Sequence, residues 1–243
     1  TFLEDGSSNF SKVFATNYAL EADSNTSSIT DNAVDIFIYD TSKDSDGGAW
    51  RKRTQHTSWY NEASSSTRGS RKEFPSVAII VAETNKVHIY DGDTPTLDMW
   101  MVFNLGQMIG EGIISCVTAM NGQLAVGNSG NASYDLNVVR FLTDDGRQYS
   151  TAGVGQLYAG NIGQRNALAT YHDTTAHGNI GHRTIRDVTI TVLPNAPIDI
   201  ATGLAIPTIA IATGGGLTII NNDGTVSNRA SGSSNYETMN IHF

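Results

Sequence analysis

Three histidines recur at five-residue intervals in the segment YHDTTAHGNIGHR and are the first candidates for metal chemistry. His172, His177 and His182, together with Asp173, are of the ligand types that Zn²⁺ prefers. A five-residue spacing does not bring three side chains onto one face of a helix or of a strand. The favoured interpretation is therefore a loop in which the histidines make hydrogen bonds, and a zinc site is the alternative.

Asp40, Asp44 and Asp46 lie in or beside the segment SKDSDGGAW and form the second candidate metal site. Their carboxylates could supply oxygen ligands to Ca²⁺, although the later glutamate and the full spacing of an EF-hand loop are missing. The segment is similar to the Asp-box of sialidase-type propellers, Ser-x-Asp-x-Gly-x-Thr-Trp, displaced by one residue. An Asp-box is a folding element without a catalytic role. We therefore expect no metal, and a polar hairpin turn in which Asp44 and Asp46 accept hydrogen bonds from backbone N–H groups.

No set of residues in the sequence predicts a catalytic centre or a cofactor site. The single cysteine, Cys116, lies in an apolar run without a nucleophile motif and is expected to be a buried hydrophobic residue. Glu62 and Glu111 stand alone, whereas sugar hydrolysis uses a pair of carboxyl groups. The glycines at 214–216 lie between two strand-like segments, so no helix follows them to bind a phosphate. We expect a protein that is not an enzyme and holds no cofactor.

The composition favours an all-β fold and argues against two classes of partner. The 243 residues include 24 glycines, and only 16% of them are charged, so strong helix formers are scarce. The net charge of −9 argues against nucleic acid, which requires a basic surface. No apolar run reaches the roughly 18 residues that a membrane-spanning helix needs, and no membrane contact is expected.

Strand and turn signals alternate along most of the chain. The clearest unit runs from Phe74 to Phe103 and contains strands at 77–81, 87–89 and 99–103. The dipeptide Asn121-Gly122 predicts a two-residue hairpin turn. A short helix is expected around 164–170, a loop at 227–236, and the start of a strand at 238–243. The other expected strands are 34–40 with its return strand 50–54, 113–120 with 123–127, 136–142 with 147–150, 185–193, and 208–212 with 217–221.

A repeated pattern indicates how these strands are organised. Each unit has a small apolar strand, a turn, an alternating strand and an Asp-Gly turn, and the small strands are 78–81, 124–126 and 209–212. Repeating four-stranded units with a small inner strand are typical of β-propeller blades. We predict β-propeller-like repeats of antiparallel four-stranded sheets, with a β-sandwich as the alternative. Residues 1–33 are expected to be an N-terminal arm or loop, and 34–243 one domain that continues beyond Phe243.

Two polar connections are long for a domain of this size. They span residues 55–72 and 153–183, and long loops are usually functional or disordered. They carry the aromatic residues Trp59, Tyr60, Tyr158 and Tyr171 among Ser, Gly and Asn. We expect these four residues to contact another subunit in a homo-oligomer.

Three segments resemble virion proteins of uncultured marine bacteriophages. They are VDIFIYDTSKDSDGGAWRKRTQHTSWYNE (34–62), RGSRKEFPSVAIIVAE (68–83) and KVHIYDGD-x5-MWMVF (86–103). The resemblance covers about residues 30–105, and the rest agrees only in the style of the repeats. It implies a structural virion protein, tail- or fibre-associated, whose partners are other virion proteins. The alternative is a carbohydrate-binding or sugar-cleaving propeller that acts on a host-surface glycan, which a cleft with carboxylates and arginines would favour.

Overall fold

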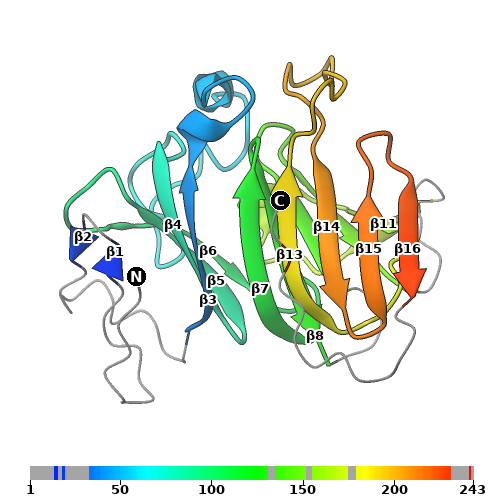
Figure 1. Ribbon diagram of the computed structural model, residues 1–243. Helices are drawn as coiled ribbons and strands as arrows, with labels where there is room; N and C mark the ends of the chain where they lie inside the picture. The colour runs from blue at the N-terminus through cyan, green and yellow to red at the C-terminus, as the bar shows by residue number, and fades with distance from the viewer. Residues whose placement is uncertain are drawn as a thin grey trace.

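The structure is a computed structural model that describes residues 14–15, 18–19, 33–130, 135–151, 155–174, 179–230 and 241. It is all-β, as the composition predicts, and its main strands form three antiparallel sheets (Figure 1). The helical segments of the described residues are three short 3₁₀ helices: η2 (Thr41–Lys43), η3 (Ala49–Arg53) and η4 (Ile162–Gln164).

Each sheet is built from strands that follow one another along the chain. The first sheet contains β3 (Ala33–Asp40), β4 (Val77–Glu83), β5 (Lys86–Asp91) and β6 (Met99–Asn104). The second contains β7 (Ile113–Met120), β8 (Gln123–Ser129), β9 (Leu136–Arg140), β10 (Asp145–Tyr149), β11 (Gly155–Tyr158) and β12 (Tyr171–Thr174). The third contains β13 (Ile185–Thr191), β14 (Thr208–Thr213), β15 (Gly216–Ile220) and β16 (Val226–Ala230). A two-stranded ribbon, β1 (Phe14–Ala15) with β2 (Tyr18–Ala19), precedes them.

The second sheet is covered on both faces, which explains why β8 and β9 are buried along nearly their whole length. Leu124 and Val126 belong to the core shared with the first sheet, where Trp59, Trp100 and Phe74 pack against Phe141. Ala125, between them in sequence, belongs to a second core shared with the third sheet. Successive side chains of β8 therefore point alternately into the two cores.

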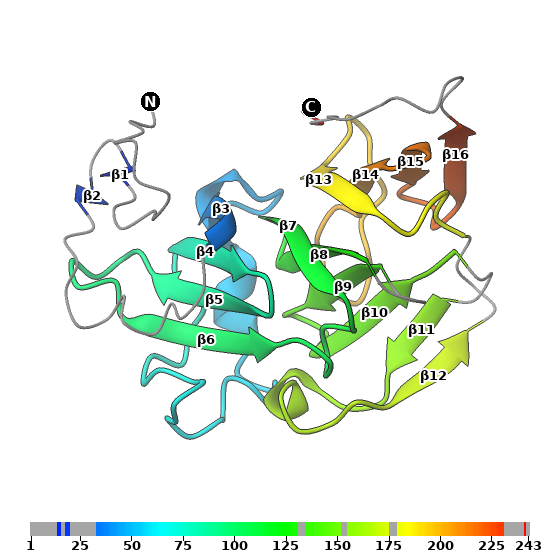
Figure 2. The ribbon, with the colours of Figure 1, turned by 90° about the horizontal axis from the view of Figure 1, so that it is seen from below.

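The first strands of the three sheets lie near the middle of the molecule, with β7 between β3 and β13, and the later strands of each sheet lie further out (Figure 2). They are joined by side chains, since none of the three forms a ladder with another. Asp35 on β3 accepts a hydrogen bond from Val117 N on β7 (2.8 Å), and Ser115 on β7 donates to Ile185 O on β13 (2.8 Å).

Most of the predicted strands are confirmed, and so is the hairpin at Asn121-Gly122, where both residues have positive φ (51° and 66°). The small apolar strands occupy equivalent places, because β4, β8 and β14 are each second in their sheet. They are not the innermost strands, however. That place belongs to β3, β7 and β13, which carry longer side chains.

Several local predictions are wrong. Residues 50–54 do not return along β3, since Ala49–Arg53 is the helix η3 and β3 pairs with β4 instead. In place of the helix expected at 164–170, the chain forms the shorter η4 at 162–164. The strands β11 and β12 extend the second sheet within 153–183, which was expected to be a long polar connection. Asp145 and Gly146 lie within β10 rather than in its turn. The loop expected at 227–236 begins with β16, and the strand expected at 238–243 lies outside the described residues except for 241.

Candidate functional site

The predicted histidine ligands lie partly outside the described residues, and those that are described belong to no metal-binding group. His172 is exposed on β12, and His182 Nδ1 accepts a hydrogen bond from Thr184 N (3.1 Å). His177 and the side chain of Asp173 lie outside the described part of the structure. Among the described residues, no group of three or more His, Cys, Asp or Glu is arranged to hold a metal ion.

Asp44 was expected to accept hydrogen bonds from backbone N–H groups of its own turn. Instead, its carboxylate is the centre of a buried cluster that includes a residue of the second sheet. Its Oδ2 accepts hydrogen bonds from Tyr39 OH (2.6 Å) and Trp50 Nε1 (2.6 Å). Its Oδ1 accepts from Asn121 N (2.7 Å), which lies at the β7–β8 turn of the second sheet. Burial raises the pKa of Asp44, and the hydrogen bonds oppose that shift. The carboxylate joins the first sheet to the second.

The other two aspartates of this segment act locally, as the sequence predicts for Asp46. Asp46 Oδ1 accepts from Gly48 N (3.0 Å), and its Oδ2 pairs with Arg53 (2.7 Å). Asp40 Oδ1 accepts from Ser42 N and Ser42 Oγ at the start of η2. The oxygens that were candidates for Ca²⁺ therefore serve the fold.

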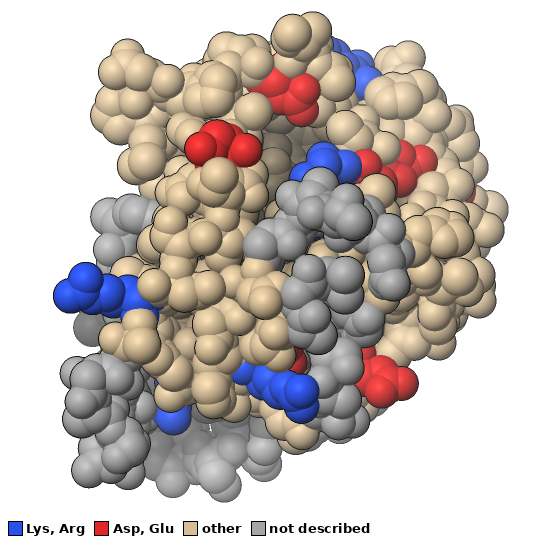
Figure 3. Space-filling view, turned by 90° about the vertical axis from the view of Figure 1, so that its right-hand side faces the viewer, with Lys and Arg blue, Asp and Glu red and all other residues tan. Residues whose placement is uncertain are grey.

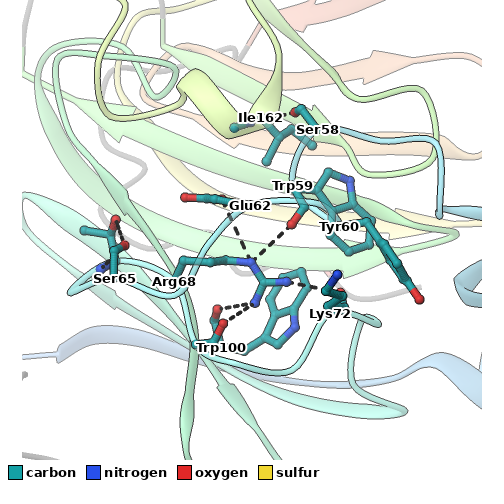
Figure 4. A network of polar contacts seen from close by, with 12 residues as sticks. Ser58, Trp59, Tyr60, Glu62, Ser65, Arg68, Lys72, Trp100 and Ile162 are labelled. Atoms are coloured by element: carbon teal, nitrogen blue, oxygen red, sulfur yellow. Dashed lines mark hydrogen bonds and ion pairs between the residues drawn. The ribbon is translucent and has the colours of Figure 1, made fainter.

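Two buried arginines hold the connection 55–72 against the sheets, although the sequence gives no sign of it. Arg68 and Arg165 are each 1% exposed. Arg68 donates to backbone carbonyls of Trp59, Gly69, Trp100 and Lys72 and stacks over the Trp100 ring (Figure 4). Arg165 donates to Glu62 Oε2 (2.6 Å) and to the carbonyls of Val102, Ile162 and Thr67. A guanidinium has five donors in a fixed fork, which suits a bundle of carbonyls.

The four aromatic residues expected at a subunit interface have contacts within the chain. Trp59 is fully buried and donates to Phe141 O (2.9 Å). Tyr158 is buried in the same core, and Tyr171 packs against it with its hydroxyl on Gln107 O and Met108 O. These rings are taken up by the protein's own core because the long connections fold back onto it. Contact with another subunit stays a prediction. Of the four residues, the half-buried Tyr60 has the side chain most available for it.

A cleft of about 290 Å³ lies between the second and third sheets and is a candidate site for a small ligand. Its walls come from β9 and β10, from the β7–β8 and β15–β16 turns, and from residues 199–207. Two arginines (Arg140 and Arg147) and two aspartates (Asp199 and Asp223) line it. Figure 3 shows this side of the molecule hollowed near its upper edge, with basic and acidic side chains around the opening.

The loop between β13 and β14, residues 192–207, projects beyond the strand ends (Figure 1) and is called the projecting loop below. Two backbone hydrogen bonds order its base: Asp199 N donates to Leu204 O (2.8 Å), and Ile206 N donates to Pro197 O (2.8 Å). The loop exposes three apolar side chains: Leu193 (42% exposed), Ile198 (59%) and Ile200 (98%). In the sequence this stretch reads LPNAPIDI (193–200), with apolar residues beside prolines.

Asp135 gives a prediction for the pH dependence of stability. It is fully buried, and neither carboxylate oxygen accepts a hydrogen bond from a described residue. Burial raises its pKa from 3.8 to about 6, and the charge of Arg183 opposes that shift. The folded state therefore holds this proton more tightly than the unfolded state, and this contribution to stability, complete below the unfolded pKa, is lost as the pH rises through about 6.

We expect Asp135→Asn to raise the free energy of unfolding at pH 8 by about 1 to 3 kcal/mol and to change it little at pH 3.5. Urea unfolding of both proteins over this pH range measures the difference. The exposed Asp223, whose pKa is lowered by hydrogen bonds from Thr225, supplies the control Asp223→Asn, which should show no such gain. Parallel pH curves for the wild type and Asp135→Asn would contradict the prediction.

Comparison with known proteins adds no functional assignment. No protein-family model matches this chain, and no curated protein matches it either. Within the described residues, no helix has both the length and the apolar character needed to span a membrane. The function has to be argued from the cleft, the projecting loop and the arrangement of the sheets.

Proposed function

We propose that this chain is a structural virion protein, tail- or fibre-associated, that acts through contacts with other subunits and not through catalysis. The virion assignment is supported by the sequence resemblance of residues 34–103. The contact function is supported by the projecting loop.

We also propose that the three sheets are propeller blades. Each begins with a strand at the middle of the molecule and adds its next strands outward in chain order. That order is expected for blades around a common axis, where the innermost strands approach without pairing. Face-to-face packing is shared with β-sandwiches, the alternative, but in a sandwich the first strands of successive sheets need not converge.

The observation that carries the contact function is the exposed apolar surface of the projecting loop. Isolated exposed apolar residues are common, but Leu193, Ile198 and Ile200 lie within eight residues on an ordered loop that stands out from the molecule. Hydrophobic groups grouped in this way mark association sites. A second copy of this chain is the partner we propose, in line with the homo-oligomer predicted from the sequence.

Replacing Ile200 with aspartate is expected to weaken self-association at least about tenfold, because a charge at the contact must lose its water. Sedimentation velocity over a concentration series measures the association constant of both proteins.

Ile113→Asp is the matched control, since Ile113 is also exposed (52%) but lies at the start of β7. It should associate as the wild type does. A wild-type chain that stays monomeric throughout the series would refute the proposal. Equal weakening by both substitutions would show that the projecting loop is not the contact.

A further inference from the structure

We propose that the cleft between the second and third sheets binds a carboxylate-bearing sugar unit, with Arg147 holding the carboxylate. The inference is independent of self-association. It starts from the pairing of β9 with β10, in which Arg140 lies opposite Asp145 and Arg147 lies opposite Val138. Side chains two residues apart on a strand share a face, so both arginines point from the second sheet toward the third.

The two arginines differ in what they already bind. Arg140 makes a two-pronged ion pair with Asp145 across the ladder, so its charge is compensated within the protein. Arg147 makes no ion pair and no side-chain hydrogen bond with the described residues, and its Nε is buried without a partner. A buried donor without an acceptor costs stability unless something else supplies the acceptor. Thr143 Oγ1, also on the cleft wall, is buried and unpartnered in the same way.

The charge of the cleft selects the kind of anion. A guanidinium matches a single carboxylate through two parallel hydrogen bonds. Asp199 and Asp223 line the same cleft, and the hydrogen bonds from Thr225 lower the pKa of Asp223, so it is ionised at neutral pH. Two aspartates would repel a multiply charged phosphate more strongly than a singly charged carboxylate.

The remaining lining residues suit hydroxyl groups and a carbon ring. Asn222, in the β15–β16 turn, brings an amide donor and acceptor, whereas the amide nitrogen of Asn221 already donates to Thr225 and Ser227. The carboxylates can accept from hydroxyl groups. Ile209 and Ile220, paired across β14 and β15, are buried at the third-sheet wall and give it an apolar surface. Apolar walls with a few placed polar groups are the usual make-up of a small-molecule site. A uronic acid combines the carboxylate, the hydroxyls and the apolar ring face that this lining would recognise.

The test is calorimetric titration of the whole chain with D-galacturonate, with D-galactose as the neutral comparison and acetate as the carboxylate alone. We expect saturable binding of galacturonate, at least about tenfold tighter than that of either comparison ligand. This arm uses only the wild-type protein and does not depend on how a variant folds. Inorganic phosphate, titrated in the same way, should bind more weakly than galacturonate.

The variant Arg147→Gln should bind galacturonate about tenfold or more weakly and leave the weak response to galactose unchanged. Arg229→Gln is the matched control. Arg229 is exposed on β16 and pairs with Leu217, outside the cleft lining, so this variant should bind as the wild type does. Circular dichroism and the thermal midpoint establish that each variant is folded. Failure of the wild type to bind galacturonate, equal affinity for galactose, or unchanged affinity in folded Arg147→Gln would each overturn the proposal.

Discussion

Replacing Arg165 with methionine is expected to lower the free energy of unfolding by about 3 to 5 kcal/mol. The guanidinium is 1% exposed and donates to Glu62 Oε2 (2.6 Å) and to the carbonyls of Val102 (2.7 Å) and Thr67 (2.7 Å). Methionine keeps most of the packing volume but removes every donor. Glu62 then keeps only the longer ion pair with Arg68 (3.9 Å), and the carbonyls of Val102 and Thr67 keep only their neutral donors, Asn166 Nδ2 and Val102 N, in a region that water reaches poorly.

Urea unfolding measures this loss, and Arg53→Met is the control. Arg53 also pairs with a carboxylate, Asp46, but its side chain is 46% exposed. Exposed ion pairs contribute between zero and about 1 kcal/mol, so the control should lose no more than that. If Arg165→Met were as stable as Arg53→Met, the cluster around Arg165 would not be a stabilising element.

The double variant Arg165→Met with Glu62→Gln separates the two sources of the loss. Glutamine removes the charge of Glu62, which in Arg165→Met has lost its short ion pair and keeps only the longer one with Arg68, so the double variant should be more stable than the single one. The part that is not recovered belongs to the carbonyls of Val102, Ile162 and Thr67.

Strands and turns whose conformation depends on neighbouring residues could be predicted from the sequence. The strand at 34–40 alternates and is rich in β-branched residues, and Asn121-Gly122 can adopt the positive φ angles that a two-residue hairpin turn requires. The polar strand β16, VSNRA, was missed. Its side chains are mostly exposed, so it has no hydrophobic alternation, and its place is set by backbone pairing with β15.

The candidate sites were harder to predict, because each depends on residues that are distant in sequence. Arg165 is 103 residues from Glu62, and Arg147 lines a cleft whose opposite wall starts some 50 residues later. Aromatic residues in a polar loop suggested an outer contact for Trp59, yet that loop folds inward because Arg68 and Arg165 bind its backbone. No spacing rule reveals which carbonyls an arginine will reach.

Asp44 likewise makes contacts that are distant in sequence, and its replacement is expected to cause the second large loss of stability. The SKDSDGGAW segment predicted a hairpin turn, but Asp44 accepts from Asn121 N, 77 residues away, and from the indole of Trp50. Trp50 is fully buried and bonded to Asp44, and residues 49–53 around it form η3 instead of a strand along β3. Tyr39 completes the cluster, since its hydroxyl donates to Asp44 and accepts from Gly122 N (2.8 Å).

Replacing Asp44 with alanine is therefore expected to lower the free energy of unfolding by about 3 kcal/mol or more, because three buried donors lose their acceptor at once. Asp46→Ala, two residues along, is the control. It loses one bond to Gly48 N and a half-exposed ion pair, and should cost about 1 kcal/mol. Urea unfolding at pH 7 compares the two. Tyr39→Phe should cost less than Asp44→Ala, since Trp50 and Asn121 keep the carboxylate. Equal losses for Asp44→Ala and Asp46→Ala would mean that the carboxylate of Asp44 does not join the first two sheets.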